Sequence, residues 1–171
     1  MEKILFSPHA IEDKVLELAD RLNSMYPPGQ RTNPNEHPVL TPILQGGITF
    51  FQDVAKNLLF DAYVDCVGVA SYKGKSRGEI NLYKDWSADL VDKDVWLIDD
   101  ICDSGKTMAY LQQLAYDKGA KRVYKATLLE RHDCPIELDF SGYTIQDEWV
   151  FGYGMDHPDG LGRLSDSIFE V

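Results

Sequence analysis

The chain has 171 residues, 44% of them hydrophobic, and its formal net charge is −11. This length suits one domain with a sizeable core, and the acidic balance argues against binding to a nucleic-acid backbone. Because no apolar run reaches about 18 residues, we expect no membrane-spanning helix.

The N-terminal segment carries the signals of a helix start. Ser7 is a good N-cap, and Pro8 suits the first helical position. Apolar residues then recur at spacings of three and four, which indicates one buried stripe. These residues are Ile11, Val15, Leu18, Leu22 and Met25. We expect a structural helix that Pro27-Pro28-Gly29 ends.

A first strand, loop and helix are expected between residues 39 and 59. Residues 39–44 have the apolar character of a strand, and residues 48–59 that of a helix. Between them lies Gln45-Gly46-Gly47, where two glycines allow the backbone to approach a ligand closely. The pattern fits either a second anion site or a plain turn.

Two further strands are expected over residues 63–70 and 80–86. The segment between them, residues 71–79, is polar, glycine-punctuated and basic within an acidic protein. Such a segment is either a mobile lid over a site or a solvated hairpin tip.

The central stretch of the chain combines a buried strand with a polar loop. Residues 95–98 are apolar and predict a strand of a parallel sheet, and Asp99 and Asp100 follow at its carboxyl end, where open α/β sheets place ligands. The loop 103–107 then leads into a helix from Met108. Free N–H groups and the helix dipole make this loop an anion site suited to phosphate.

The carboxylates beside this loop have two possible uses. Asp99 and Asp100 can accept hydrogen bonds from sugar hydroxyls, or help to hold hydrated Mg²⁺ beside a diphosphate. The alternative is a strand, turn and helix cap without a ligand, although paired acids at a buried strand end are costly without a partner. A nucleoside-triphosphate P-loop is excluded, because its first glycine would have to stand where this chain has Asp100.

The rest of the chain continues the alternation and then becomes strand-rich. The helix from Met108 closes at Lys118-Gly119, and the next strand, residues 123–129, ends at Glu130-Arg131. Strands are also expected over residues 143–145 and 148–153. The alternation over residues 39–129 predicts an α/β fold with a parallel sheet. Trp149, at a strand start, fits core packing as a first interpretation.

The cysteines and histidines show no metal-site or disulfide pattern. Cys66, Cys102 and Cys134 are odd in number and far apart, and the four histidines lack metal spacing. The N-terminus has no signal-peptide pattern. We therefore expect a cytoplasmic, reducing location and neither a disulfide framework nor a zinc site.

The stretch from Asp99 to Thr107 resembles the phosphoribosyl-diphosphate motif of type I phosphoribosyltransferases, and within them most resembles hypoxanthine-guanine phosphoribosyltransferases. The likeness extends from about Leu40 to about Arg163. It implies one domain over residues 1–171, with a core of about 39–130 in which helices flank a central parallel sheet. It also implies a small hood from the N-terminal and C-terminal segments, and a homodimer or homotetramer.

The resemblance also implies roles for single residues. Asp103 is the expected general base for the purine N7 proton. The expected phosphoribosyl-diphosphate-binding residues are Gln45 (often Lys in the family), Gly46, Gly47, Ser71, Tyr72, Asp99, Asp100, Asp103, Ser104, Gly105, Lys106, Thr107 and Arg163. Ser71 and Tyr72 would begin a loop that closes over the site. Asp99, Asp100 and Asp156 are the expected Mg²⁺ ligands.

The base-binding residues implied by the resemblance are Arg131, Trp149 and Val150. Trp149 would stack on the purine, Val150 would offer main-chain groups, and Arg131 would donate to the 6-oxo oxygen where the family usually has Lys. The implied reaction is Mg²⁺-dependent transfer of 5-phosphoribosyl from its 1-diphosphate to hypoxanthine or guanine. Alternatives are a phosphoribosyltransferase for xanthine or a pyrimidine, or a non-catalytic nucleotide-sensing regulator on this fold that binds RNA.

Overall fold

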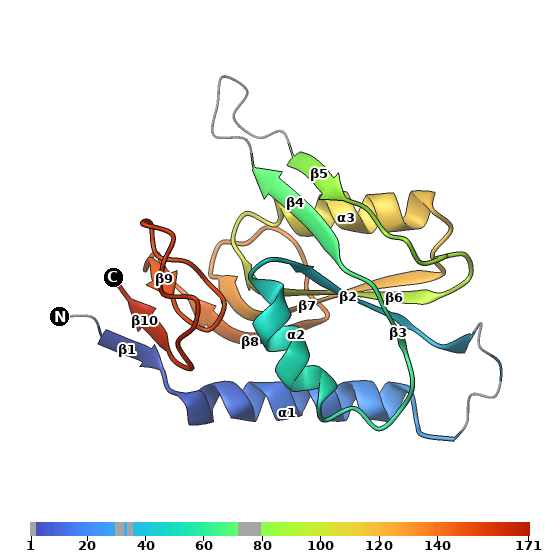
Figure 1. The fold of residues 1–171 in the computed structure, drawn as a ribbon, viewed down its shortest axis with the longest axis horizontal. Coiled ribbons are helices and arrows are strands. Elements are labelled where there is room, and N and C mark those ends of the chain that lie inside the picture. The colour runs from blue at the N-terminus through green and yellow to red at the C-terminus, as the bar shows by residue number, and fades with distance from the viewer. Residues whose placement is uncertain (1–2, 30–32, 34–35, 72–79) are drawn as a thin grey trace.

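A seven-stranded sheet forms the centre of the computed structural model, which describes residues 3–29, 33, 36–71 and 80–171 (Figure 1). Its strands are β2 (Val39–Leu44), β3 (Tyr63–Val64), β4 (Val67–Ser71), β5 (Ile80–Lys84), β6 (Asp94–Cys102), β7 (Arg122–Arg131) and β8 (Phe140–Ile145). The order is β5-β4-β2-β6-β7-β8, and β3 also pairs with β2. All of these pairs are parallel except β4–β5. The expected α/β class is confirmed.

Helices cover both faces of this sheet. Helices α1 (Pro8–Met25) and α2 (Gly47–Ala55) lie on one side, and α3 (Lys106–Asp117) lies on the other (Figure 1). Side chains alternate along β6, because successive residues of a strand point to opposite faces. Trp96 and Ile98 join the cluster under α1 and α2, whereas Val95 and Leu97 join the cluster under α3. The apolar run of β6 is therefore buried from both sides, as in parallel sheets generally.

Helix α1 begins as its sequence predicts. The Ser7 hydroxyl accepts a hydrogen bond from the Ala10 N–H at 3.3 Å, and Pro8 is the first helical residue. The apolar stripe faces the core, where Ile11, Val15, Leu18 and Leu22 are buried. None of the helices that the structure describes is both long and apolar enough to cross a membrane.

A second sheet joins the two ends of the described chain. It consists of β1 (Lys3–Phe6), β10 (Ile168–Glu170) and β9 (Val150–Phe151), in that order, and both pairs are antiparallel. Figure 1 shows this sheet at one end of the molecule, beside the start of α1. The sequence did not predict β1 or β10, because these short strands are defined by pairing with residues far away in the chain.

Several predicted boundaries are corrected by contacts between side chains and backbone. The strand expected over 63–70 is interrupted at Asp65, whose carboxylate accepts a hydrogen bond from the Ala88 N–H at 2.8 Å. The strand expected over 80–86 ends at Lys84, since the Trp86 ring turns inward and its Nε1–H donates to Thr41 Oγ1 at 2.9 Å.

Two further corrections concern α2 and β6. The helix expected over 48–59 ends at Ala55, and the segment after it is held by Asn23, which bonds the Asn57 carbonyl and the Leu59 N–H. Strand β6 runs past the acid pair to Cys102, because its pairing with β7 continues that far. Of the lid expected over 71–79, all but the backbone of Ser71 lies outside the described residues.

Candidate functional site

A cavity of about 170 Å³ lies where β6 passes into α3. It is lined by the whole expected phosphate loop and its neighbours: Asp99, Ile101, Cys102, Asp103, Ser104, Gly105, Lys106, Thr107 and Met108. Gly105 is the N-cap of α3 and has φ of 72°, so no cap side chain covers the helix start. A Cβ at Gly105 would also lie 2.9 Å from Ile136. The loop thus leaves the first amides of α3 available to an anion.

The acid pair lies at the edge of this cavity. The Asp100 N–H donates to Asp99 Oδ1 at 2.9 Å, and the Ile101 N–H donates to Asp100 Oδ1 at 2.7 Å. Asp100 is only 8% exposed. Burial, followed by the charge of Asp100, raises the pKa of Asp99 well above its ordinary value. Burial also raises the pKa of Asp100, while the charge of Arg163 acts in the opposite direction. A cation or a hydroxyl donor would relieve this like-charge contact.

The Gly46-Gly47 turn packs directly against the acid pair. A Cβ at Gly46 would overlap with the Asp100 carboxylate, and one at Gly47 would lie 2.6 Å from the Ile98 carbonyl oxygen. Gly46 is also the N-cap of α2, and the Leu44–Gln45 peptide bond before it is cis. A side chain would therefore clash at Gly46 with the Asp100 carboxylate and at Gly47 with the backbone of β6. The close approach of a ligand that the two glycines indicated stays a prediction.

A second cavity, of about 200 Å³, adjoins the first. It is lined by Asp100, Ile101, Asp103, Arg131, Trp149, Val150, Met155 and Asp156. Ile101 and Asp103 line both cavities. The Trp149 side chain is not core, because this residue is 57% exposed, whereas its neighbour Val150 is buried in β9. An exposed Trp on the wall of a cavity is well placed to stack on a flat ligand.

Arg131 connects three separate segments at the mouth of the second cavity. Its Nε–H donates to Asp103 Oδ1 at 3.0 Å, and its Nη1 group donates to the carbonyls of Gln146 and Glu148 at 2.6 and 2.7 Å. The Arg131 side chain is 14% exposed and that of Asp103 is 74% exposed. The sequence placed Arg131 at the ligand edge of the sheet but gave no sign of these partners.

The C-terminal turn brings Arg163 and Asp156 to the same region. Arg163 forms an ion pair with Asp156 at 3.0 Å and donates to the Gly154 carbonyl at 2.5 Å. Gly154, with φ of 95°, packs so closely that a Cβ there would lie 2.7 Å from the Gly46 carbonyl oxygen. Arg163 is thereby held beside the glycine turn and the acid pair.

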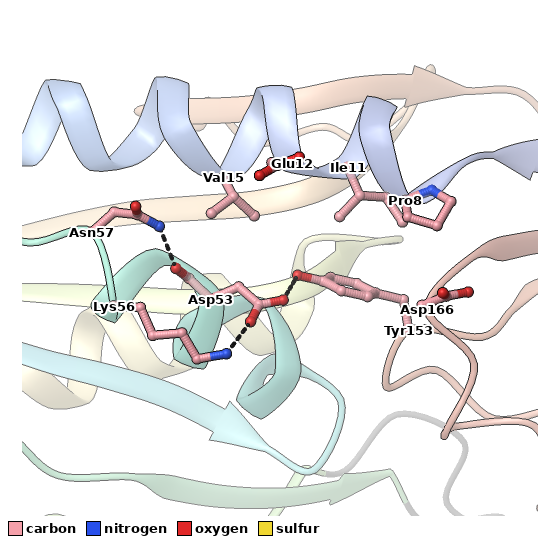
Figure 2. Close-up of a pocket in the computed structure, with 9 residues that line it drawn as sticks. All are labelled: Pro8, Ile11, Glu12, Val15, Asp53, Lys56, Asn57, Tyr153 and Asp166. Carbon is pink, nitrogen blue, oxygen red and sulfur yellow. Dashed lines mark hydrogen bonds and ion pairs between the residues drawn. The ribbon is translucent and has the colours of Figure 1, made fainter.

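Tyr153 anchors this C-terminal turn to α2, a contact that sequence reasoning missed. Its hydroxyl donates to Asp53 Oδ2 at 2.6 Å, and Lys56 pairs with the other carboxylate oxygen at 2.8 Å (Figure 2). The contact borders a separate cavity of about 340 Å³ beside α1. Burial opposes ionisation of Asp53, but hydrogen bonds from Lys56 and Tyr153 outweigh it and lower its pKa.

The structure thus gathers most of the expected residues around two adjoining cavities. Gly46, Gly47 and Arg163 lie close to the acid pair but line neither cavity, and Gln45, which is exposed, lines neither of them either. Tyr72 lies outside the described residues, and only the backbone of Ser71 is described. Within the described part of the chain, no group of three or more His, Cys, Asp or Glu side chains is arranged to hold a metal ion. The assignment of Asp99, Asp100 and Asp156 as joint ligands therefore stays a prediction.

Comparison with known proteins gives consistent similarities. Residues 3–158 match the family model of the phosphoribosyl transferase domain. The chain is 31% identical to the hypoxanthine-guanine phosphoribosyltransferase of Bacillus subtilis, over 99% of this chain and 97% of that protein. It is 32% identical to the bifunctional protein TilS/HprT of Listeria innocua over 96% of this chain, and it spans about a quarter (25%) of that relative's length. A crystal structure of a hypoxanthine phosphoribosyltransferase from Staphylococcus aureus superposes with a TM-score of 0.88 at 28% identity, covering 99% of this chain and 90% of that one.

Proposed function

Because this chain belongs to the phosphoribosyl transferase domain family, we propose that it transfers the 5-phosphoribosyl group of 5-phosphoribosyl 1-diphosphate to a 6-oxopurine, hypoxanthine or guanine. The products are the nucleoside 5′-monophosphate and diphosphate, a purine-salvage reaction. The observation that carries the proposal is the meeting of the two cavities at Asp103. One cavity has the chemistry for a sugar phosphate, and the other has the chemistry for a flat base.

In this proposal the 5′-phosphate occupies the cavity at the start of α3. The loop 103–107 offers backbone N–H groups at the positive end of the helix dipole, which favours a dianion. Asp99 and Asp100 accept hydrogen bonds from the ribose hydroxyls. Binding of these hydroxyls adds further hydrogen-bond donors to the backbone N–H groups from which the buried acid pair already accepts.

The leaving diphosphate lies against the Gly46-Gly47 turn, with the Arg163 guanidinium beside it. Breaking the bond between C1 and oxygen builds negative charge on the leaving group, and donors fixed beforehand stabilise that charge. Mg²⁺ prefers one or two carboxylates together with substrate oxygens and water, so Asp99 and Asp100 suit it without a three-carboxylate cage. Asp156, held by Arg163, is the further expected ligand. When bound, Mg²⁺ would neutralise charge on the diphosphate.

Asp103 acts as the general base in this proposal. Its side chain is 74% exposed and lines both cavities, so it stands between the sugar and the base. An ionised carboxylate at this place can take the N7 proton as the purine bonds to C1. Such a group typically contributes about 10²–10⁴ in rate.

The purine is proposed to lie against the exposed face of Trp149, with Val150 at its edge. Arg131 is a donor at the same cavity, and a donor favours the 6-oxo oxygen of hypoxanthine, guanine or xanthine. Adenine would place its 6-amino donor against the Arg131 donor and would leave buried groups unpaired. We extend the proposal to a cytoplasmic location and to a homodimer or homotetramer, since closed symmetric assemblies, most often C2 dimers, are the usual form of soluble homo-oligomers.

A base-panel assay tests this function. Release of diphosphate from 5-phosphoribosyl 1-diphosphate is measured in the presence of Mg²⁺, in separate reactions with hypoxanthine, guanine, xanthine, adenine or uracil, and in one reaction without a base. Hypoxanthine or guanine should give the fastest release, adenine and uracil little. Faster release with xanthine or uracil would favour the alternative enzymes. No release with any base, combined with RNA binding, would favour the regulatory protein.

A further inference from the structure

Two cysteines lie in contact beside the phosphate loop. The Sγ atoms of Cys102 and Cys134 are 3.0 Å apart, although 32 positions separate the residues in the chain. Both are free thiols; Cys102 is buried at the end of β6 and Cys134 is half-buried in the turn after β7. The third cysteine, Cys66, lies in the connection between β3 and β4. The proposed transfer reaction has no use for any of the three thiols.

We propose that Cys102 and Cys134 form a reversible disulfide that locks the phosphate loop. A disulfide has sulfur atoms about 2.05 Å apart, so closing the bond requires an approach of about 1 Å. Cys134, the more accessible thiol, is expected to meet the oxidant first. This pair could not be predicted from the sequence, because neither the spacing nor the number of the cysteines indicates one.

The oxidant class is a peroxide, and the reaction balances in two steps. The Cys134 sulfur attacks one peroxide oxygen, which gives a sulfenic acid and one water from hydrogen peroxide. The Cys102 sulfur then attacks the sulfenic sulfur and expels its hydroxyl group, which leaves with the Cys102 thiol proton as a second water. Two thiols lose two electrons in total, and one hydrogen peroxide is reduced to two waters.

The disulfide would act on the site through both of its neighbours. Cys102 directly precedes Asp103, and Ile136, close to Cys134, already packs against Gly105. The new bond therefore ties the segment 134–136 to the loop and shifts the peptide that carries Asp103. A displacement of about 1 Å at a reacting group can cost about 10²-fold in rate. This effect on activity rests on the proposed function, whereas formation of the disulfide does not.

The test uses the full chain, first reduced and then treated with hydrogen peroxide. Free thiols are alkylated before peptide mapping by mass spectrometry. We expect one cross-linked peptide pair that joins Cys102 to Cys134, with the loss of two hydrogens and with Cys66 alkylated. The kcat/KM for hypoxanthine should fall at least about tenfold, and dithiothreitol should restore it.

Matched variants separate the pair from other oxidation. Cys134→Ser should keep its activity through the peroxide treatment, and Cys66→Ser should lose activity as the unmodified chain does. The proposal is overturned if both thiols remain alkylatable, if the cross-linked chain is fully active, or if Cys134→Ser is inhibited equally. An inactive reduced chain would instead refute the proposed function, and the peptide map would still decide whether the disulfide forms.

Discussion

Replacement of Arg131 by Met tests the link between the proposed base cavity and Asp103, the proposed general base. Met keeps a long apolar side chain but removes the donors to Asp103 and to the carbonyls of Gln146 and Glu148. The pair with Asp103 is worth at most about 1 kcal/mol, because that carboxylate is exposed. Each charged hydrogen bond to a carbonyl is worth about 1.5–3 kcal/mol.

The two hydrogen bonds from Arg131 to these carbonyls determine how much activity the substitution removes. They fix the segment that leads directly to Trp149, so their loss loosens one wall of the base cavity. A loss of about 3 kcal/mol in transition-state positioning corresponds to roughly 10²-fold in kcat/KM. We therefore expect Arg131→Met to lose most activity on hypoxanthine, guanine and xanthine alike. Arg131→Lys should retain 6-oxo selectivity and change the ranking of the three bases, since a point charge replaces a planar fork.

The assay is steady-state kinetics with each base at saturating 5-phosphoribosyl 1-diphosphate. Arg122→Met is the matched control, because Arg122 is exposed at the opposite end of the same strand and should tolerate the change. An Arg131→Met variant with the full base profile would refute the reasoning. Efficient use of adenine by the unmodified chain would refute it equally.

Three further substitutions test other parts of the site. Asp103→Asn should lower kcat about 10²-fold or more with nearly normal calorimetric binding of 5-phosphoribosyl 1-diphosphate; an unchanged kcat, where chemistry limits the rate, would remove Asp103 from the general-base role. Trp149→Ala should weaken purine binding by ~1–3 kcal/mol and leave 5-phosphoribosyl 1-diphosphate binding unaffected; equal weakening of both ligands in calorimetry would contradict stacking. Tyr153→Phe should lower the free energy of unfolding by about 1 kcal/mol. The pKa of Asp53 is lowered in the folded chain, so the ionised carboxylate stabilises the fold above its unfolded pKa, and this stabilisation fades as the pH falls. The stability lost in Tyr153→Phe should therefore be smaller at acidic pH. Urea unfolding that gives the same loss at neutral and acidic pH would argue against the Asp53 contact.

The features that the sequence predicted well are those defined by neighbouring residues. The start of α1 follows from Ser7 and Pro8, and the loop 103–107 before α3 follows from a buried strand, small residues and a helix start. The acid pair was expected to follow the strand, whereas it lies within β6, which continues past it to Cys102. For the first two features a local pattern determines the local structure.

The features that the sequence did not predict depend on residues far apart in the chain. Strand β1 exists because it pairs with β10 at the other end of the chain. Tyr153 and Asp53 are 100 positions apart, and Arg131 finds its carbonyl partners 15 and 17 positions away. No periodicity or spacing encodes such contacts, and the Cys102–Cys134 pair is of the same kind.

Purine nucleotide formation measured together with diphosphate release tests the central claim most directly. The reduced chain is incubated with 5-phosphoribosyl 1-diphosphate, Mg²⁺ and hypoxanthine, and both products are quantified over time. Transfer to the base predicts that the hypoxanthine nucleoside 5′-monophosphate and diphosphate appear in equal amounts, at a rate that Asp103→Asn lowers. Diphosphate released without the nucleotide would show hydrolysis instead of transfer and would contradict the proposed function.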